Sequence, residues 1–451
     1  MSAPATATGH ELSLGQEALW FLQQLAPGSS AYNVSGALNL HFPVDAGRMA
    51  AAVEQTVSGH ATLNCVFRMA GGEVRRFGAG TGAAALQVHE VAGDDRSVRD
   101  YALGWAQQPF RLDAQVPIRV ALLRRDRGAD VLLMAAHHIT MDYASQVLVL
   151  REILDRYAGV AGTATDSGAA YDGFVRQQRR YLDSPRAAAA RRYWRTELEQ
   201  AVPGDLPTDA PRPAVYTFAG AEVDFQLPPG VLARVRRAAA AQNATPFAFL
   251  FAAFQLLLYA RSGQTDLLLG YPVSLRAGRQ LRDSIGYYVN TLPFHARVDP
   301  GGSFGALLHR TGGKLLRALM YRDYPFALMP RLVQAGREPD RAGLFSTMFV
   351  MTYDVPDDPL SAAQAPGTRV ELAGLLVSEF YLPQQQGQFD VTLQVAPGSG
   401  QAQLKYNTSL FTVDTARELA AGYLAVLRSA VDGTLPARLR EVRAGIPDEG
   451  A

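Results

Sequence analysis

The chain has very little cysteine and almost no net charge. Its 451 residues include one cysteine, Cys65, so no disulfide can form within the chain, which fits a reducing compartment. Cys65 stands among apolar residues, and this favours a buried packing role over a nucleophilic one. Lysine and arginine number 43 against 42 acidic residues, which gives a formal net charge of +1. Nucleic acid and anionic membranes are therefore not expected as partners, because no strong field would attract them.

Long hydrophobic runs are also missing. The stretch nearest to a membrane span, 246–259, falls short of the roughly 18 consecutive apolar residues that a span needs, and is typical of a buried core helix. Residues 1–13 lack the basic segment and apolar core of a secretory signal. These features predict a cytoplasmic protein.

Two adjacent histidines follow a strongly apolar run. The six apolar residues of 131–136 predict a fully buried strand, and His137 and His138 come where it ends. Asp142 follows four residues after His138, where a carboxylate can accept backbone N–H groups at the start of a helix predicted over 143–157. Histidine is well suited to proton transfer near neutral pH, so this turn is the first candidate for a catalytic site.

Two other interpretations of the histidine pair stay open. A histidine beside a buried strand is often a structural residue rather than a catalyst. Two histidines and a carboxylate also have the ligand types of a metal site. Successive side chains of a strand point to opposite faces, so the two rings are poorly placed to bind one ion, and only one can face a given cleft. We therefore expect no metal here.

Strand and helix signals alternate through two successive parts of the chain, which predicts an α/β fold class. The region 176–198 is predicted to be a basic, amphipathic helical region. Four prolines within 203–213 favour an extended, semi-rigid connection. We predict an N-terminal lobe over 1–202, a proline-rich linker over 203–215 and a C-terminal lobe over 216–451.

The pattern HHxxxD at 137–142 resembles the HHxxxDG signature of the condensation domains of nonribosomal peptide synthetases and their acyltransferase relatives. Other segments that resemble landmarks of this family occur along the chain in the same order. Seven further segments resemble landmarks of the family: LSLGQEALW (12–20), GHATLNCVF (59–67), YDGF (171–174), LPTDAPRP (206–213), IGYYVNTLP (285–293, resembling IGxFVNTLP), RDYPF (322–326) and FDVTL (389–393). The chain is identified as a member of this family over about residues 10–432.

The resemblance implies two chloramphenicol-acetyltransferase-like lobes in a V-shaped pseudo-dimer, with the active site in a tunnel between them. It implies acyl transfer from the phosphopantetheine thioester of a carrier protein to an amine or hydroxyl acceptor, forming an amide or an ester. No cofactor bound by the enzyme itself is implied. Because a thioester is already activated, the enzyme must align two reactants, handle one proton and stabilise an oxyanion.

The resemblance also implies roles for individual residues. His138 corresponds to the catalytic histidine, which acts as a general base or holds the nucleophile and stabilises charge; the sequence leaves both roles open. His137 is expected to orient the turn. Asp142 is expected to pair with Arg276, and both are expected to be structural residues at the active site. Asn290 is expected to line the substrate tunnel or, equally, to bond a turn.

Two positions depart from the family pattern. Tyr143 stands where the signature has glycine, and our hypothesis is that its ring reshapes the acceptor side of the substrate tunnel; neutral packing into a neighbouring gap is the alternative. Asn64 stands where arginine is usual, which indicates a divergent member with an unusual substrate.

The sequence contains no phosphopantetheine attachment motif and no adenylation motif. We expect a free-standing, monomeric condensation enzyme of natural-product (antibiotic) biosynthesis. It would act on the acyl or peptidyl carrier protein of a synthetase, with a small acceptor in a chain-releasing step or a second carrier protein. Three alternatives stay open: an ester-forming acyltransferase associated with polyketide synthesis, an epimerization domain, and a non-catalytic domain that recruits partner enzymes.

Overall fold

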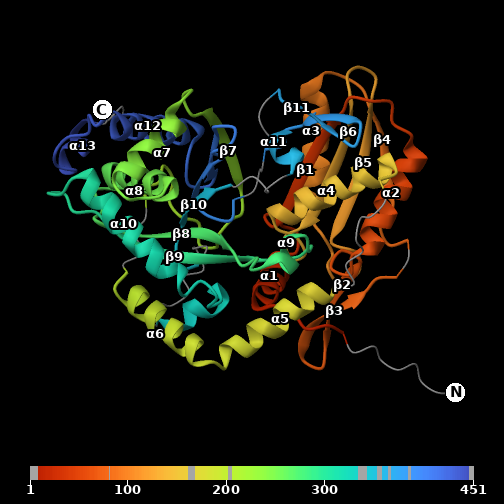
Figure 1. The fold of residues 1–451 in the computed structure, drawn as a ribbon, viewed down its shortest axis with the longest axis horizontal. Helices are drawn as coiled ribbons and strands as arrows, with labels where there is room; N and C mark the ends of the chain where they lie inside the picture. Colours follow the sequence, from red (N-terminus) through yellow and green to blue (C-terminus); the bar gives the residue numbers. More distant parts are fainter. Residues whose placement is uncertain are drawn as a thin grey trace. The chain divides into compact units, whose positions relative to one another are not determined.

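The chain folds into two compact units that are interleaved in sequence (Figure 1). The structure is a computed structural model that describes residues 9–80, 82–160, 168–201, 206–333, 343–352, 358–363, 367–383 and 387–445. The first unit takes its residues from 1–183, 274–289 and 354–383, and the second takes the remainder. The first unit therefore includes two segments from beyond the predicted linker.

The first unit is built on a six-stranded sheet of order β11-β12-β1-β6-β5-β4, in which only β4 and β5 pair in parallel. The strands of this sheet are β1 (Asn33–Leu40), β4 (Leu86–Val91), β5 (Ile118–Arg125), β6 (Asp130–His137), β11 (Arg369–Leu372) and β12 (Leu375–Glu379). A separate hairpin consists of β2 (Cys65–Ala70) and β3 (Glu73–Gly78). The helices of the unit are α1 (Leu14–Leu25), α2 (Ala46–Gly59), α3 (Asp95–Ala106), α4 (Tyr143–Ala158), α5 (Ala169–Leu182), α9 (Arg279–Arg282) and α11 (Pro359–Ala363).

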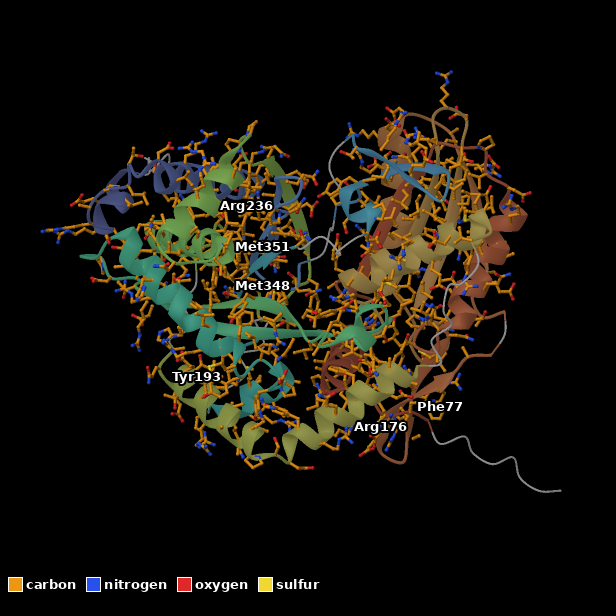
Figure 2. All side chains as sticks on the ribbon, viewed as in Figure 1. Phe77, Arg176, Tyr193, Arg236, Met348 and Met351 are labelled. Atoms are coloured by element: carbon orange, nitrogen blue, oxygen red, sulfur yellow. The ribbon has the colours of Figure 1, made fainter. Side chains whose placement is uncertain are left out.

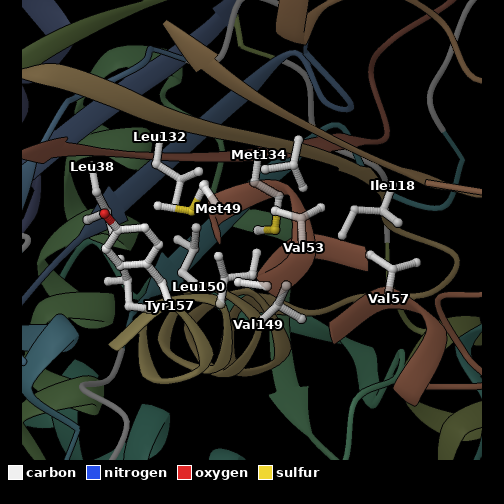
Figure 3. Close-up of a cluster of buried hydrophobic side chains, with 14 of the residues drawn as sticks. Leu38, Met49, Val53, Val57, Ile118, Leu132, Met134, Val149, Leu150 and Tyr157 are labelled. Atoms are coloured by element: carbon white, nitrogen blue, oxygen red, sulfur yellow. The ribbon is translucent and has the colours of Figure 1, made fainter. Parts of the chain in front are cut away.

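The strand β6 is buried on both faces, and its side chains enter two core clusters alternately. One cluster contains residues of α2 and α4 (Figure 3) together with Leu132, Met134 and Ala136. The other contains residues of α1 and α3 together with Val131, Leu133 and Ala135. All six side chains are 0% exposed, which confirms the predicted buried strand and explains why its sequence is apolar without alternation.

Two helices near the end of β6 begin at well-formed N-caps. Ser13 caps α1 in a capping box with Gln16, each side chain accepting the other residue's backbone N–H at 3.2 Å. The buried amide of Gln16 also donates to the carbonyl of Ile139 at 2.7 Å, so α1 is tied to the turn that follows β6. Asp142 caps α4 by accepting the N–H of Ser145 at 2.8 Å.

The second unit contains a six-stranded sheet of order β7-β14-β13-β10-β8-β9. Its strands are β7 (Gly220–Gln226), β8 (Asp266–Ser274), β9 (Val289–Arg297), β10 (Thr347–Met351), β13 (Val391–Val395) and β14 (Gln401–Asn407), where Ser274 and Val289 are the strand ends that belong to the first unit. Its helices are α6 (Pro185–Glu199), α7 (Val231–Ala241), α8 (Pro246–Ser262), α10 (Phe304–Leu319), α12 (Val413–Asp432), α13 (Arg440–Gly445) and the 3-10 helix η1 (Phe326–Leu332).

The helix α8 is buried on all sides from Ala248 to Ala260, which confirms the predicted core helix. In the part of the chain that the structure describes, no single helix is long and apolar enough to cross a membrane. The helices α7 and α8 meet that test only as a pair, and they are bent by 99° relative to each other.

The predicted helical region over 176–198 is confirmed, but it is divided between two helices. Two helices, α5 and α6, occupy this stretch and are separated at Asp183 and Ser184. Ser184 has an extended backbone and caps α6 by accepting the N–H of Ala187 at 3.2 Å, and Pro185 is its first residue. Tyr193 of α6, labelled in Figure 2, stacks on Tyr321 with ring centroids 4.4 Å apart, which packs α6 against its own unit.

Candidate active site

The two adjacent histidines lie in different surroundings. His137 is 1% exposed at the end of β6, and its ring contacts Phe110 and Tyr32 at centroid distances of 6.4 Å each. Its Nδ1 accepts the N–H of Ile139 at 3.1 Å, and burial, with the neighbouring His138, lowers its pKa to about 3. The ring therefore stays neutral, and its role in orienting the turn stays a prediction.

His138 is only half-buried, and its ring is oriented by the turn that it begins. Its Nδ1 lies 2.5 Å from the carbonyl of Met141, so Nδ1 carries the proton and donates, and Nε2 keeps its lone pair. Its backbone N–H donates to the carbonyl of Tyr32 on the neighbouring chain segment at 2.8 Å. Burial lowers the pKa of the imidazole, while the Met141 carbonyl and the charge of Asp142 act in the opposite direction. The net result is a neutral imidazole with its Nε2 available as a proton acceptor.

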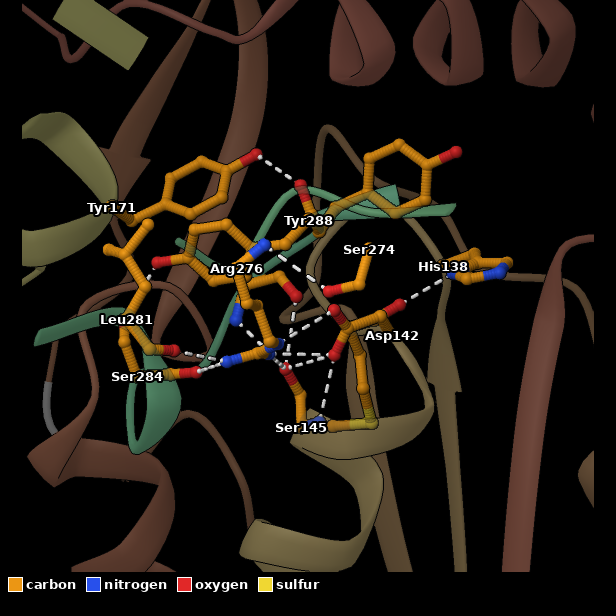
Figure 4. A network of polar contacts seen from close by, with 12 residues as sticks. His138, Asp142, Ser145, Tyr171, Ser274, Arg276, Leu281, Ser284 and Tyr288 are labelled. Carbon is orange, nitrogen blue, oxygen red and sulfur yellow. Dashed lines mark hydrogen bonds and ion pairs between the residues drawn. The ribbon is translucent and has the colours of Figure 1, made fainter. Parts of the chain in front are cut away.

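Asp142 and Arg276 form a bidentate ion pair (Figure 4). Arg276 Nη2 donates to Asp142 Oδ1 at 2.7 Å, and Nε donates to Oδ2 at 3.1 Å. The side chains are 5% and 10% exposed for Asp142 and Arg276, so the pair is largely shielded from water. The carboxylate of Asp142 thus faces Arg276 and the start of α4. The two residues are 134 positions apart in sequence but belong to the same compact unit.

The guanidinium of Arg276 also organises the segment that contains it. Its Nη1 donates to the carbonyls of Leu281 and Ser284 at 2.6 Å each, and its plane lies over the ring of Tyr288 at 4.4 Å. All these contacts lie within the segment 274–289. Arg276 therefore stabilises the fold of this segment and anchors it to Asp142.

The hydroxyl of Ser145 is a second junction in the same network, which the sequence analysis missed. It accepts from Arg276 Nη2 at 2.6 Å and from the N–H of Gly286 at 3.0 Å. Its one proton goes to Asp142 Oδ1 at 2.8 Å or to the Gly286 carbonyl at 3.0 Å. Its position three residues after the N-cap Asp142 was the one sequence signal for its contact with Asp142. Its partners Arg276 and Gly286, 131 and 141 residues away, were not predictable.

The two residues predicted to line the substrate tunnel have clear local contacts. Tyr143 is the first residue of α4 and is half-buried against the core cluster of α2 and α4. Asn290, in the second unit, donates to the carbonyls of Arg322 and Tyr324 at 2.7 and 2.8 Å and accepts the N–H of Phe326 at 2.9 Å. These bonds match the turn-bonding alternative for Asn290 and join the segments 285–293 and 322–326. The tunnel-lining roles of Tyr143 and Asn290 stay predictions.

The side chains around the histidine pair have few free metal-ligating atoms. Among the described residues, no group of three or more such side chains could hold a metal ion. Asp142 is committed to Arg276 and to the N-terminus of α4, and Nδ1 of His138 is committed to a carbonyl. The arrangement therefore offers one neutral imidazole with a supporting ion pair.

Comparison with known proteins places this geometry in a family. A family model described as the condensation domain matches residues 7–441. The chain is 33% identical over 435 residues to the phosphinothricin tripeptide synthetase PhsC of Streptomyces viridochromogenes, covering 93% of this chain and 39% of that protein. It is 28% identical over 424 residues to tyrocidine synthase 3 of Brevibacillus parabrevis, covering 93% of this chain and 6% of that protein. The chain thus spans less than half the length of these curated relatives.

Solved structures support the fold. A four-domain nonribosomal peptide synthetase bound to AMP and glycine superposes with a TM-score of 0.88 at 22% identity, over 98% of this chain and 34% of that one. The X-domain from teicoplanin biosynthesis superposes with a TM-score of 0.82 at 21% identity, over 97% and 98% of the two chains. The predicted chloramphenicol-acetyltransferase-like α/β fold is confirmed by these likenesses.

Removing either partner of the Asp142–Arg276 pair should strongly destabilise the protein. Asp142→Ala or Arg276→Ala leaves a buried charge unpaired, so each should lower the free energy of unfolding by about 3–5 kcal/mol, measured by urea denaturation. The double variant should lose much less than the sum of the two, because no unpaired charge remains.

The exposed pair Asp414–Arg417 on α12 provides a matched control, since its side chains are 79% and 65% exposed. Asp414→Ala and Arg417→Ala should have little effect on the same measurement. Equal, small losses at both pairs would contradict the anchoring role of Asp142 and Arg276.

Proposed function

This chain belongs to the condensation-domain family of nonribosomal peptide synthetases, and from that premise we propose that it is an acyltransferase. It transfers an acyl group from the phosphopantetheine thioester of a carrier protein to an acceptor amine and forms an amide. The alternative is a hydroxyl acceptor, which would give an ester. The protein relatives named above are peptide synthetases and synthases, and this favours the amide.

The observation that supports catalysis most directly is the state of His138. Its ring is half-buried, neutral, and held by Met141 so that Nε2 has a free lone pair for a proton. In the proposed reaction the acceptor nitrogen attacks the thioester carbonyl, the C–N bond forms and the C–S bond breaks. Nε2 of His138 takes the proton of the attacking nitrogen and delivers a proton to the departing thiolate. Asp142 and Arg276 do not touch the reactants in this scheme; they fix the turn.

The proposal is tested by acyl transfer with an acyl-loaded carrier protein. The protein is incubated with that donor and a panel of carrier-bound amines, soluble amines and alcohols, and products are identified by mass spectrometry. Transfer to a soluble acceptor would indicate chain release, and the product mass separates amide from ester. His138→Ala should reduce the rate by about 10²–10⁴-fold, the contribution expected of a general base.

The single variant His137→Ala and the double variant His137→Ala/His138→Ala complete this comparison. If His137→Ala abolished transfer while His138→Ala did not, our scheme would have named the wrong histidine as the base. Carrier binding without any transfer by the unaltered protein would favour a non-catalytic recruitment domain.

The pH dependence of the reaction should follow the neutral form of His138. Burial lowers the pKa of this imidazole below its ordinary value of 6.5, so the proton-accepting form persists at pH 6.5 and is lost only at lower pH. With an alkoxyamine acceptor, which is itself uncharged in this range, kcat/KM should stay constant above pH 6.5 and fall at more acidic pH. A fall that begins well above pH 6.5 would contradict a general base with this environment, and a flat profile would favour a purely electrostatic role.

We also propose that Tyr143 shapes the acceptor side of the site. Tyr143→Gly removes a half-buried ring and should change the KM for acceptors several-fold while the KM for the donor is kept. Tyr143→Phe is the control, because it retains the ring and its packing on the core cluster. Unchanged acceptor KM values across the panel, together with reduced stability, would assign Tyr143 to packing alone.

A further inference from the structure

Tyr287 lies directly beside the ring of His138. The centroids of the two rings are 5.1 Å apart, and their planes meet at 82°, which is the edge-to-face geometry of favourable aromatic pairs. Tyr287 occupies the variable position of the motif IGxFVNTLP that the sequence resembles, so the resemblance gives it no role. It also belongs to the same compact unit as His138, within the segment 274–289.

The backbone around Tyr287 is fixed by the network that holds Asp142. The N–H of the preceding residue, Gly286, donates to Ser145 Oγ at 3.0 Å. The hydroxyl of Tyr171 donates to the carbonyl of Tyr287 at 3.3 Å. The Tyr287 ring therefore projects from a backbone that has little freedom to move relative to the turn containing His138.

The ring of Tyr287 also fits closely against α1. A Cβ atom at Gly15 would lie only 2.7 Å from Cε1 of Tyr287 and 3.1 Å from its Cδ1. Real Cβ atoms do not approach so closely, so residue 15 has room for glycine alone while the ring keeps this place. Gly15 stands in the first turn of α1, two residues after the N-cap Ser13, and its helical backbone does not itself require glycine.

The hydrogen bond from Nδ1 of His138 to Met141 does not by itself fix the imidazole plane. A single bond sets the direction of one nitrogen and the tautomer, but the ring can still tilt about that direction. The perpendicular ring of Tyr287 limits this tilt from one side. It is also half-buried, and burial keeps its own hydroxyl protonated by raising the phenol pKa, so it presents an uncharged face to the histidine.

We propose that Tyr287 is a positioning residue that fixes the plane of the His138 imidazole and excludes water from it, and that Gly15 provides the space for this ring. The catalytic consequence rests on the proposed function of His138, whereas the effect on the imidazole itself does not. A tilt of the ring moves Nε2 away from the proton that it must accept, and displacements of this kind are costly in rate.

The test measures the imidazole and the reaction in parallel. In protein labelled with ¹⁵N-histidine, the His138 ring signals, assigned with His138→Gln, report its pKa and tautomer without turnover. Tyr287→Ala should raise that pKa toward 6.5 and reduce kcat about 10- to 100-fold with little change in KM. Tyr287→Phe, which keeps the ring, should resemble the unaltered protein in both measurements.

Gly15→Ala gives an independent route to the same displacement, because its Cβ would push the Tyr287 ring without removing it; it should move the pKa and kcat in the same direction. Tyr101→Ala is the matched control. Tyr101 packs on His89, with centroids 5.7 Å apart, outside the site, so its loss should leave His138 and kcat unchanged.

Unchanged His138 signals and kcat in both Tyr287→Ala and Gly15→Ala would overturn the inference. So would a Phe variant as damaged as the Ala variant, since the hydroxyl and not the ring would then be decisive. An active His138→Ala variant would overturn the proposed function instead, and the imidazole signals would still decide whether Tyr287 positions the ring.

Discussion

The buried ion pair between Asp142 and Arg276 is the constraint on which the candidate site depends. It joins the N-terminus of α4 to the segment 274–289, and the hydroxyl of Ser145 extends the same connection to Gly286. Taking two charges out of water is costly, and the hydrogen bonds from Arg276 to the carbonyls of Leu281 and Ser284 help to offset that cost. The gain from this arrangement is a fixed geometry for two separate parts of the chain around His138.

Much of the fold could be predicted from local patterns. The buried strand at 131–136 and the core helix at 246–259 have apolar signals within a short stretch of sequence, and both elements were predicted correctly. The break between α5 and α6 has an equally local signal in Ser184 and Pro185, which the amphipathic pattern over 176–198 concealed. The pairing of β12 with β1, such as Leu38 with Glu379, was not predictable, because it joins residues more than 300 positions apart and depends on the chain returning to an open sheet edge.

The candidate site divides in the same way. The resemblance to a family pointed to His138, Asp142 and Arg276, and the structure contains the ion pair. The tautomer of His138 depends on one backbone carbonyl, that of Met141, which no sequence pattern encodes. Ser145 and Tyr287 were missed because their importance comes from partners more than 100 residues away. Sequence similarity therefore points to the candidate reacting group, whereas its three-dimensional contacts follow only from the structure.

The contrast between His137 and His138 shows how two identical side chains acquire different chemistry. They are consecutive at the end of a strand, so one ring turns into the core and the other toward the turn. His137 gives up its Nδ1 lone pair to the N–H of Ile139, and burial takes it out of proton transfer with a pKa of about 3. His138 uses Nδ1 as a donor and retains its lone pair at Nε2. Of the two, only His138 is half-buried and keeps a neutral Nε2 outside the core, because successive side chains at the end of a strand point to opposite faces.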